Sequence, residues 1–179
     1  MAVAGGTANA RVTILVDNLV RGRNLWGEHG LSLLVETGGQ MTLFDTGQSG
    51  EVLAHNAAEF GLNLADVDSV VLSHGHRDHT GGLASVLQKL GPADLYAHPG
   101  VFEKKYAKEG ESEPREIGCP ISKEDLASSK IDLHLSEAPA WLDEDVVLSG
   151  EVVRTTDFED IPRSFLVERD GVLTADPLL

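Results

Sequence analysis

Short runs of alternating apolar and polar residues open the chain after residue 10. Apolar side chains fall on one side of residues 11–17, and the same alternation recurs over residues 31–36 and 41–45. A period of two residues is that of a half-buried strand, so each run predicts one. The Gly38-Gly39 pair between the second and third runs predicts a hairpin turn.

Helical spacing and a continuous apolar run come next. Residues 51–60 place apolar side chains on one side at helical spacing and end at Gly61, which predicts a helix. Residues 68–73 contain a continuous Val-Val-Leu run, as expected for a strand in a sheet that is covered on both faces. Residues 83–90 predict a second helix, which Gly91-Pro92 would stop.

The second half of the chain predicts shorter elements. We expect a strand at 94–97, a helix at 100–108, a polar loop or lid at 109–120, a helix start at 122–125, strands at 131–135, 146–148 and 151–154, and a hairpin of 164–168 with 172–175. Strands interleaved with helices predict a mixed α/β (α+β) fold with helices on the outer face of a sheet. A length of 179 residues suits one core, so we expect a flexible tail over residues 1–10 and one domain over residues 11–179.

Composition and charge narrow the classes of function. The chain has 14 basic and 29 acidic residues, a formal net charge of −15. Such a surface repels nucleic-acid phosphates and anionic lipid, so we expect neither nucleic acid nor membrane as a partner. The one cysteine, Cys119, excludes an internal disulfide and favours a cytoplasmic location, and its loop-like setting predicts that it packs rather than reacts. Residues 1–10 lack the basic and apolar regions of a signal peptide, and no stretch reaches membrane-spanning length.

The segment Ser73–Gly82 carries the strongest chemical signal. It holds three imidazoles and a carboxylate, His74, His76, Asp78 and His79, within six positions directly after an apolar strand. Alternate strand residues project to one side, so His74 and His76 can bind one cation together while Asp78 and His79 point to a neighbouring position. Imidazole and carboxylate suit one or two divalent ions, Zn²⁺ first and Fe or Mn as alternatives.

This segment resembles the His-x-His-x-Asp-His signature of the metallo-β-lactamase superfamily, and Leu43-Phe44-Asp45-Thr46-Gly47 resembles that superfamily's first motif. Val16-Asp17-Asn18, Glu28-His29-Gly30-Leu31-Ser32 and Ala97-His98-Pro99 resemble one branch, the 7,8-dihydropterin-6-methyl-4-(β-D-ribofuranosyl)aminobenzene 5'-phosphate synthases. The resemblance implies an αββα sandwich, with two sheets back to back and helices outside. It covers nearly all of this chain but only the amino-terminal part of the family domain.

The resemblance also implies later ligands that this sequence does not contain. The family's third His, bridging Asp and final His lie in Gly-Cys-x-His and Gly-Gly-Phe-His segments, and neither occurs here. The sequence reaches Asp176-Pro177-Leu178-Leu179 where the family's second half would begin. We therefore expect a sandwich that is incomplete on its C-terminal side.

Five more residues are candidates for the site or its surroundings. By the resemblance, Asp45 braces the metal-binding loop rather than binding the ion. His98, at the end of a short strand, is placed to line the cleft as a ligand or its support, although a satisfied structural imidazole is the alternative. Glu28 and His29 are candidates for substrate binding. His134 alternates with apolar neighbours, which places it on a wet face away from the site.

Three smaller features have structural interpretations. Asp17-Asn18 is typical of a turn-forming pair. His55 is expected to be a solvated surface residue on its helix. Gly81-Gly82 is expected to let the following helix approach a strand closely and to bind nothing.

Several functions fit these observations. The first is a metal-dependent hydrolase of a small phosphorylated or carboxylated substrate. His74 and His76 would hold one ion, Asp78 and His79 a second, and the catalytic carboxylate of Asp78 would orient a bridging water of lowered pKa. The second is a truncated or split half-domain that binds metal weakly, catalyses nothing alone, and associates with itself or with a missing C-terminal half. The resemblance also implies a synthase-type transferase, and a redox member ranks last because its accessory motifs are not visible.

Overall fold

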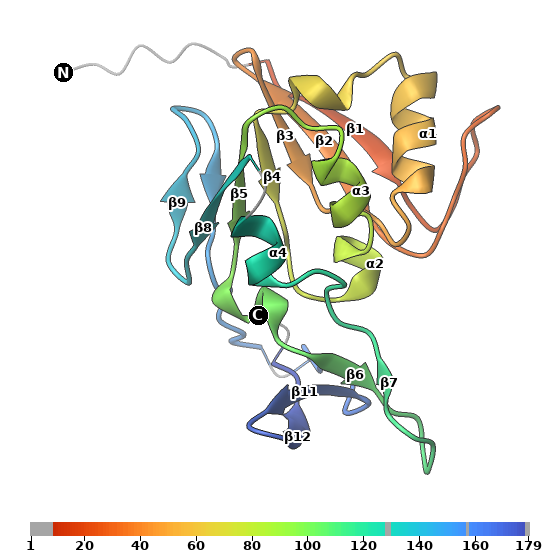
Figure 1. Cartoon of the computed structure of the whole chain (residues 1–179), viewed down its shortest axis with the longest axis vertical. Helices are drawn as coiled ribbons and strands as arrows, with labels where there is room; N and C mark the ends of the chain where they lie inside the picture. Colours follow the sequence, from red (N-terminus) through yellow and green to blue (C-terminus); the bar gives the residue numbers. More distant parts are fainter. Residues whose placement is uncertain (1–8, 128–129, 157, 178–179) are drawn as a thin grey trace.

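The computed structural model describes residues 9–127, 130–156 and 158–177 of the chain and is built around a mixed sheet (Figure 1). Across these residues the sheet has six strands in the order β1-β2-β3-β4-β5-β8. Their bounds are β1 (Arg11–Val16), β2 (Ser32–Thr37), β3 (Gln40–Phe44), β4 (Ser69–Val71), β5 (Ala93–Ala97) and β8 (Ile131–Leu135). Strands β1 to β3 pair antiparallel, and β3, β4, β5 and β8 run parallel. The mixed α/β class is therefore confirmed.

One face of this sheet forms the hydrophobic core. Leu34, Leu43, Val70 and Leu95 pair in register across four strands, and each is at most 1% exposed. Helices α1 to α3 cover this face (Figure 1). The helical segments are α1 (Glu51–Glu59), η1 (Leu64–Asp66), α2 (Arg77–Thr80), α3 (Leu83–Leu87), η2 (Pro99–Phe102) and α4 (Lys123–Ala127).

The opposite face of the sheet is only partly covered. The next row in register runs through Leu33, Phe44, Val71 and Tyr96 and begins at Ile14, which is 56% exposed. A hairpin of β9 (Ala140–Trp141) and β10 (Val147–Leu148) lies beside part of this face and borders a cleft of about 530 Å³ that is open to solvent. Within the described residues no second large sheet lies back to back with the first, so only one sheet and its helical layer of the expected sandwich are present here.

A smaller antiparallel sheet lies beyond one end of the large one, at the bottom of Figure 1. It has the order β12-β11-β6-β7. Its strands are β6 (Lys105–Ala107), β7 (Arg115–Glu116), β11 (Phe165–Arg169) and β12 (Val172–Ala175). The predicted hairpin near the C-terminus is confirmed, because Asp170 and Gly171 both take positive φ between β11 and β12.

Three sequence expectations were wrong. Residues 100–108 form the short η2 turn and then β6 instead of one helix, because pairing with β11 and β7 overrides the local helical pattern. The predicted loop at 109–120 contains β7. Residues 151–154 form no strand. Most of the predicted tail, residues 1–8, lies outside the described residues. Within the described ranges, no helix is long and apolar enough to cross a membrane.

The Gly81-Gly82 pair allows a close approach between α3 and the end of β3. A Cβ atom at Gly82 would lie 2.2 Å from the backbone oxygen of Thr46, and one at Gly81 would lie 2.0 Å from the oxygen of Gln48. These oxygens belong to the backbone and cannot rotate away. The close approach expected from the sequence is confirmed.

We therefore predict that Gly82→Ala lowers the free energy of unfolding by about 1–3 kcal/mol, the usual cost of overpacking. Urea denaturation followed by circular dichroism measures this change. Gly91→Ala is the matched control, because its Cβ would lie 3.4 Å from the oxygen of Ala65. Equal midpoints for the two variants would contradict the prediction.

Candidate metal site

The His-rich segment leaves the large sheet at the carboxyl end of β4 and turns into α2. In parallel sheets this end is where ligands bind. The ring of His74 lies with its centroid 4.7 Å from that of His76 and 4.3 Å from that of His79. Gly75 makes this turn possible, because a Cβ there would lie 2.4 Å from the backbone oxygen of Val101. The structure thus gathers the three imidazoles that the motif singled out.

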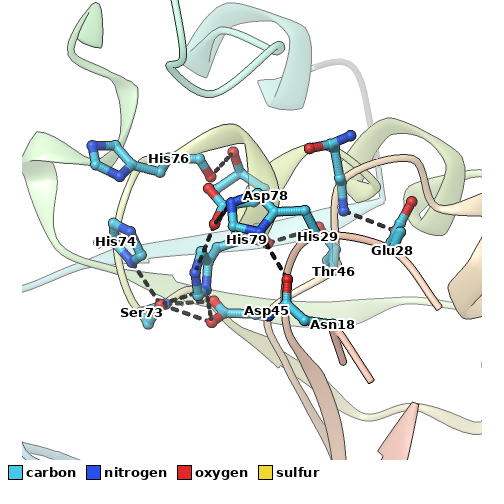
Figure 2. Close-up of polar contacts among 12 residues, drawn as sticks. Asn18, Glu28, His29, Asp45, Thr46, Ser73, His74, His76, Asp78 and His79 are labelled. Atoms are coloured by element: carbon cyan, nitrogen blue, oxygen red, sulfur yellow. Dashed lines mark hydrogen bonds and ion pairs between the residues drawn. The ribbon is translucent and has the colours of Figure 1, made fainter. Parts of the chain in front are cut away.

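The fully buried carboxylate of Asp45 holds this segment in place through hydrogen bonds to Ser73 and His79. It accepts hydrogen bonds from the backbone N–H of Ser73 at 2.8 Å, from the Ser73 hydroxyl at 2.7 Å and from Nδ1 of His79 at 2.7 Å. Figure 2 shows these contacts at the foot of the His74 and His79 rings. Asp45 itself has a positive φ of 57°, an uncommon conformation for a residue with a Cβ. Ser73 was not among the residues that we predicted to act in the site.

Each of the three imidazoles has one ring nitrogen in contact with another polar side chain. Nδ1 of His74 lies 2.9 Å from the Ser73 hydroxyl, Nδ1 of His79 meets Asp45, and Nε2 of His76 lies 3.1 Å from Oδ2 of Asp176. The second nitrogen of His79 faces Asp78, whereas those of His74 and His76 have no polar contact among those described. Metal-binding histidines in proteins are commonly held in this way, with the second nitrogen bonded to a neighbouring group.

Asp78 lies between two imidazoles. Its Oδ2 is 3.4 Å from Nε2 of His79 and 3.4 Å from Nε2 of His29. Asn18 holds the second imidazole, with its Oδ1 2.8 Å from Nδ1 of His29. Gly30 brings this loop close, because a Cβ there would lie 2.2 Å from the backbone oxygen of Asp78. His29, whose side chain is 72% exposed, therefore stands at the rim of the site.

Glu28 has a different environment from its neighbour. Its Oε1 accepts hydrogen bonds from the backbone N–H groups of Gln48 at 3.0 Å and Ser49 at 3.1 Å. The carboxylate thus ties the loop before β2 to the turn after β3. Of the two residues predicted to bind substrate, only His29 contacts the His-rich segment through its side chain.

The other histidines lie outside this cluster. His98 accepts a hydrogen bond from the backbone N–H of Gly100 and lines the cavity on the open face, and its buried Nε2 has no partner among the described residues. His134 lies on the same face, where its Nε2 is 2.6 Å from Oδ1 of Asp94. His55 was expected to be solvated, but its ring stacks on Trp26 with centroids 3.9 Å apart.

Cys119 is not poised to react. Burial raises the pKa of its thiol and so disfavours the thiolate. Sequence reasoning also missed Lys105 and Asp176, whose side chains lie within this region of the structure. Neither residue sits in a local motif, and Asp176 is 100 residues from His76. Only the folded structure brings these residues together, so no sequence motif could have predicted them.

The donor types fit a divalent cation, although the shell is not closed. Among the described residues, no group of three or more His, Cys, Asp or Glu side chains is arranged to hold an ion as the chain stands. Three imidazoles and one carboxylate nevertheless converge on one region. This donor set is typical of zinc, iron or manganese sites. The ligand roles of His74, His76, Asp78 and His79 remain predictions.

The charges of the cluster are strongly coupled. Burial, then the charges of His79 and His76, lower the pKa of His74 to about 3. At His79, burial alone would lower the pKa, but the hydrogen bonds and charges of Asp45 and Asp78 outweigh it and raise the pKa to about 9. At Asp78, burial would raise the pKa, but the His79 hydrogen bond and charge outweigh it and lower the pKa to about 2.

These pKa values predict that the stability of the cation-free chain peaks near pH 6.5. The contribution of His79 is complete below its ordinary pKa of 6.5 and is lost as the pH rises through about 9. The contribution of His74 is complete above 6.5 and is lost as the pH falls toward 3. Each loss is on the order of 3 kcal/mol.

Urea midpoints in chelator across this pH range test the prediction. Asp45→Asn should flatten the alkaline side, because the imidazolium of His79 loses its nearest carboxylate. His134→Gln, which alters an exposed imidazole elsewhere, should leave the alkaline side unchanged. An identical alkaline slope in wild type and Asp45→Asn would refute the assignment to His79.

Comparison with known proteins finds relatives that match much of the chain. An uncharacterized protein of Methanocaldococcus jannaschii, MJ0448, is 35% identical over 166 residues, which is 92% of this chain and 61% of that protein. The 7,8-dihydropterin-6-methyl-4-(beta-D-ribofuranosyl)-aminobenzene-5'-phosphate synthase of the same organism is 35% identical over 91 residues, 48% of this chain and 31% of the enzyme. The chain thus spans less than two thirds of these relatives.

The chain also has a similar solved structure and a matching family model. The Rm3 metallo-beta-lactamase superposes with a TM-score of 0.47 and 25% identity, over 69% of this chain and 45% of that structure. The model of the metallo-beta-lactamase superfamily matches residues 25–156, which include β2 to β5 and the whole His-rich segment. The resemblance seen in the motifs is confirmed, and the chain belongs to the metallo-β-lactamase superfamily.

Proposed function

We propose that this chain carries the cation-binding segment of a metal-dependent hydrolase that acts on a small phosphorylated or carboxylated substrate. One observation carries the proposal: three imidazoles cluster beside a carboxylate, each ring is held through one nitrogen by a polar neighbour, and the second nitrogen of His79 faces Asp78. His74 and His76 each keep a second nitrogen with no polar contact among those described. That arrangement presents lone pairs in fixed directions next to a carboxylate. Membership of a superfamily with many metallohydrolases agrees with it.

The side chains divide the work as follows. His74, His76, Asp78 and His79 would hold one or two divalent ions, with zinc as the first choice. When bound, such an ion supplies Lewis acidity that lowers the pKa of water toward neutrality. The Asp78 carboxylate would accept a hydrogen bond from the attacking water and orient it. Asp45 would keep the His79 ring fixed while charge develops.

The rim of the site suggests the kind of substrate. The exposed imidazole of His29 lies 3.4 Å from Asp78 and can donate a hydrogen bond to a phosphate or carboxylate oxygen. A net charge of −15 disfavours nucleic acid and membrane surfaces as partners, so a small molecule in the cytoplasm remains our expectation. The likeness to a protein named as a synthase keeps a transferase acting on a related substrate as the alternative.

The central prediction is that the chelator-stripped chain takes up zinc and that His74→Ala weakens uptake more than tenfold, because a ligand is lost. Isothermal titration and elemental analysis measure affinity and stoichiometry. His134→Ala is the control, because that ring lies on the open face and bonds only Asp94 among the contacts described. Near two equivalents of metal, with hydrolysis of bis-p-nitrophenyl phosphate or p-nitrophenyl acetate, would support the hydrolase.

Two outcomes would count against this function. Unchanged zinc affinity in His74→Ala would place the ion elsewhere. One equivalent or less, loosely held and without hydrolysis, would favour the second candidate instead.

The second candidate is a half-domain that binds metal weakly and needs a complementary half. A specific observation favours it: the sheet face opposite the helices presents Val12 and Ile14 at 57% and 56% exposed. Leu33, Phe44 and Tyr96, in the same row as Ile14, are partly exposed. Large exposed apolar surface on one sheet face is typical of an interface.

We predict that the open face promotes self-association or dye binding, and that the double variant Val12→Ser, Ile14→Ser reduces both. Sedimentation equilibrium and anilinonaphthalene sulfonate fluorescence measure these properties. Val172→Ser, at an exposed residue of β12, is the matched control. A wild-type monomer with no dye binding would refute the role of this face.

A further inference from the structure

A buried ion pair joins the small sheet to the His-rich segment. Nζ of Lys105 donates to Oδ1 of Asp176 at 2.7 Å, and the two side chains are 1% and 0% exposed. Lys105 comes from β6, and Asp176 directly follows β12. Burying two charges costs more than their attraction returns in many proteins, so a pair of this kind is weak as a stabiliser alone. Its position suggests a second role.

The other carboxylate oxygen of Asp176 faces the His-rich segment. Oδ2 lies 3.1 Å from Nε2 of His76, whose ring is buried. An ionised carboxylate can only accept, so the ring nitrogen must donate, and Nε2 carries the proton. The lone pair of the neutral ring then resides on Nδ1. The tautomer of His76 is therefore set by a carboxylate 100 residues away in the sequence.

The rest of the surroundings fix the direction of this ring. The ring of Phe165, in β11, packs edge-on against it with centroids 4.9 Å apart. The backbone oxygen of His76 accepts hydrogen bonds from the N–H groups of His79 and Thr80 at 3.0 Å. A bridge between His76 and Gly118, and a hydrogen bond from Arg77 to the oxygen of Ile117, attach the segment beside β7. The small sheet thus holds His76 from several sides.

We propose that Asp176, oriented by Lys105, is a positioning residue that keeps His76 in the Nε2–H tautomer with Nδ1 free to bind a cation. This inference rests on the proposed metal-dependent function. The small sheet then has a role in the site, because it supplies the carboxylate that orients one ligand. Uptake of the ion and docking of β11 and β12 are then linked, because both depend on the same ring.

Asp176→Asn tests the proposal with little change in volume. The amide can donate to Nε2, which would then accept, and the proton would move to Nδ1. Long-range ¹⁵N–¹H spectra of the cation-free chain distinguish the two tautomers. We expect Nε2–H in the wild type, a shift toward Nδ1–H in Asp176→Asn, and zinc affinity lower by 10- to 100-fold.

Asp94→Asn is the matched control, because Asp94 bonds His134 at 2.6 Å in a pair of the same chemistry on the open sheet face. It should leave the tautomer of His76 and the affinity for zinc unchanged. A destabilising loss at Asp176 alone would not move the ring proton, so the spectrum separates positioning from mere structural support.

The outcomes are distinct from those of the proposed function. A wild-type His76 that carries its proton on Nδ1 overturns the positioning role, and this measurement needs no variant and so survives misfolding of Asp176→Asn. An unchanged tautomer with unchanged zinc affinity in Asp176→Asn also overturns it. A wild-type chain that takes up no zinc rejects the proposed function, and the spectra then decide the His76–Asp176 contact separately.

Discussion

The buried carboxylate of Asp45 is the contact on which the arrangement of the candidate site depends. It sits at the end of β3 and accepts three hydrogen bonds from the segment that follows β4, two from Ser73 and one from His79. The backbone N–H of Asp45 donates to Val71 at 2.8 Å, which continues the pairing of these two parallel strands. A fully buried carboxylate is costly unless such donors surround it. The same contacts that satisfy Asp45 therefore fix where the His79 ring lies.

The local part of this structure could be predicted from sequence because its causes are local. Alternation in β1 to β3, the helical spacing of α1 and the buried run at β4 each reflect a period that one segment displays by itself. The close spacing of His74, His76, Asp78 and His79 likewise predicts a metal site from the sequence alone. The close approach at Gly82 followed from two adjacent glycines at a strand-to-helix turn.

The parts that sequence could not predict depend on partners far along the chain. The sequence of β6 predicts the end of a helix, but the segment is a strand because it pairs with β11. The sequence of β7 predicts a loop, but the segment is a strand because it pairs with β6. Lys105 looks like a surface residue in a charged stretch, yet it is 1% exposed because Asp176 meets it. His55 looks solvated until Trp26 stacks on it from the preceding loop. In each case the contact that determines the structure joins residues too far apart in the sequence for a local hydrophobic pattern to predict it.

The candidate site combines a motif that is local in the sequence with supports that come from far along the chain. The four residues of the motif lie within six positions, and Asp45, which braces them, comes from the end of β3, 28 positions before Ser73 and 34 before His79. Both lie within the region that the superfamily model matches. The residues that surround them come from the loop at Asn18 and His29 and from the small sheet at Asp176. A site assembled in this way can keep one cation-binding segment while its rim and supports change. The motif by itself therefore does not specify one reaction, and the groups around it, such as His29, differ from it in where along the chain they come from.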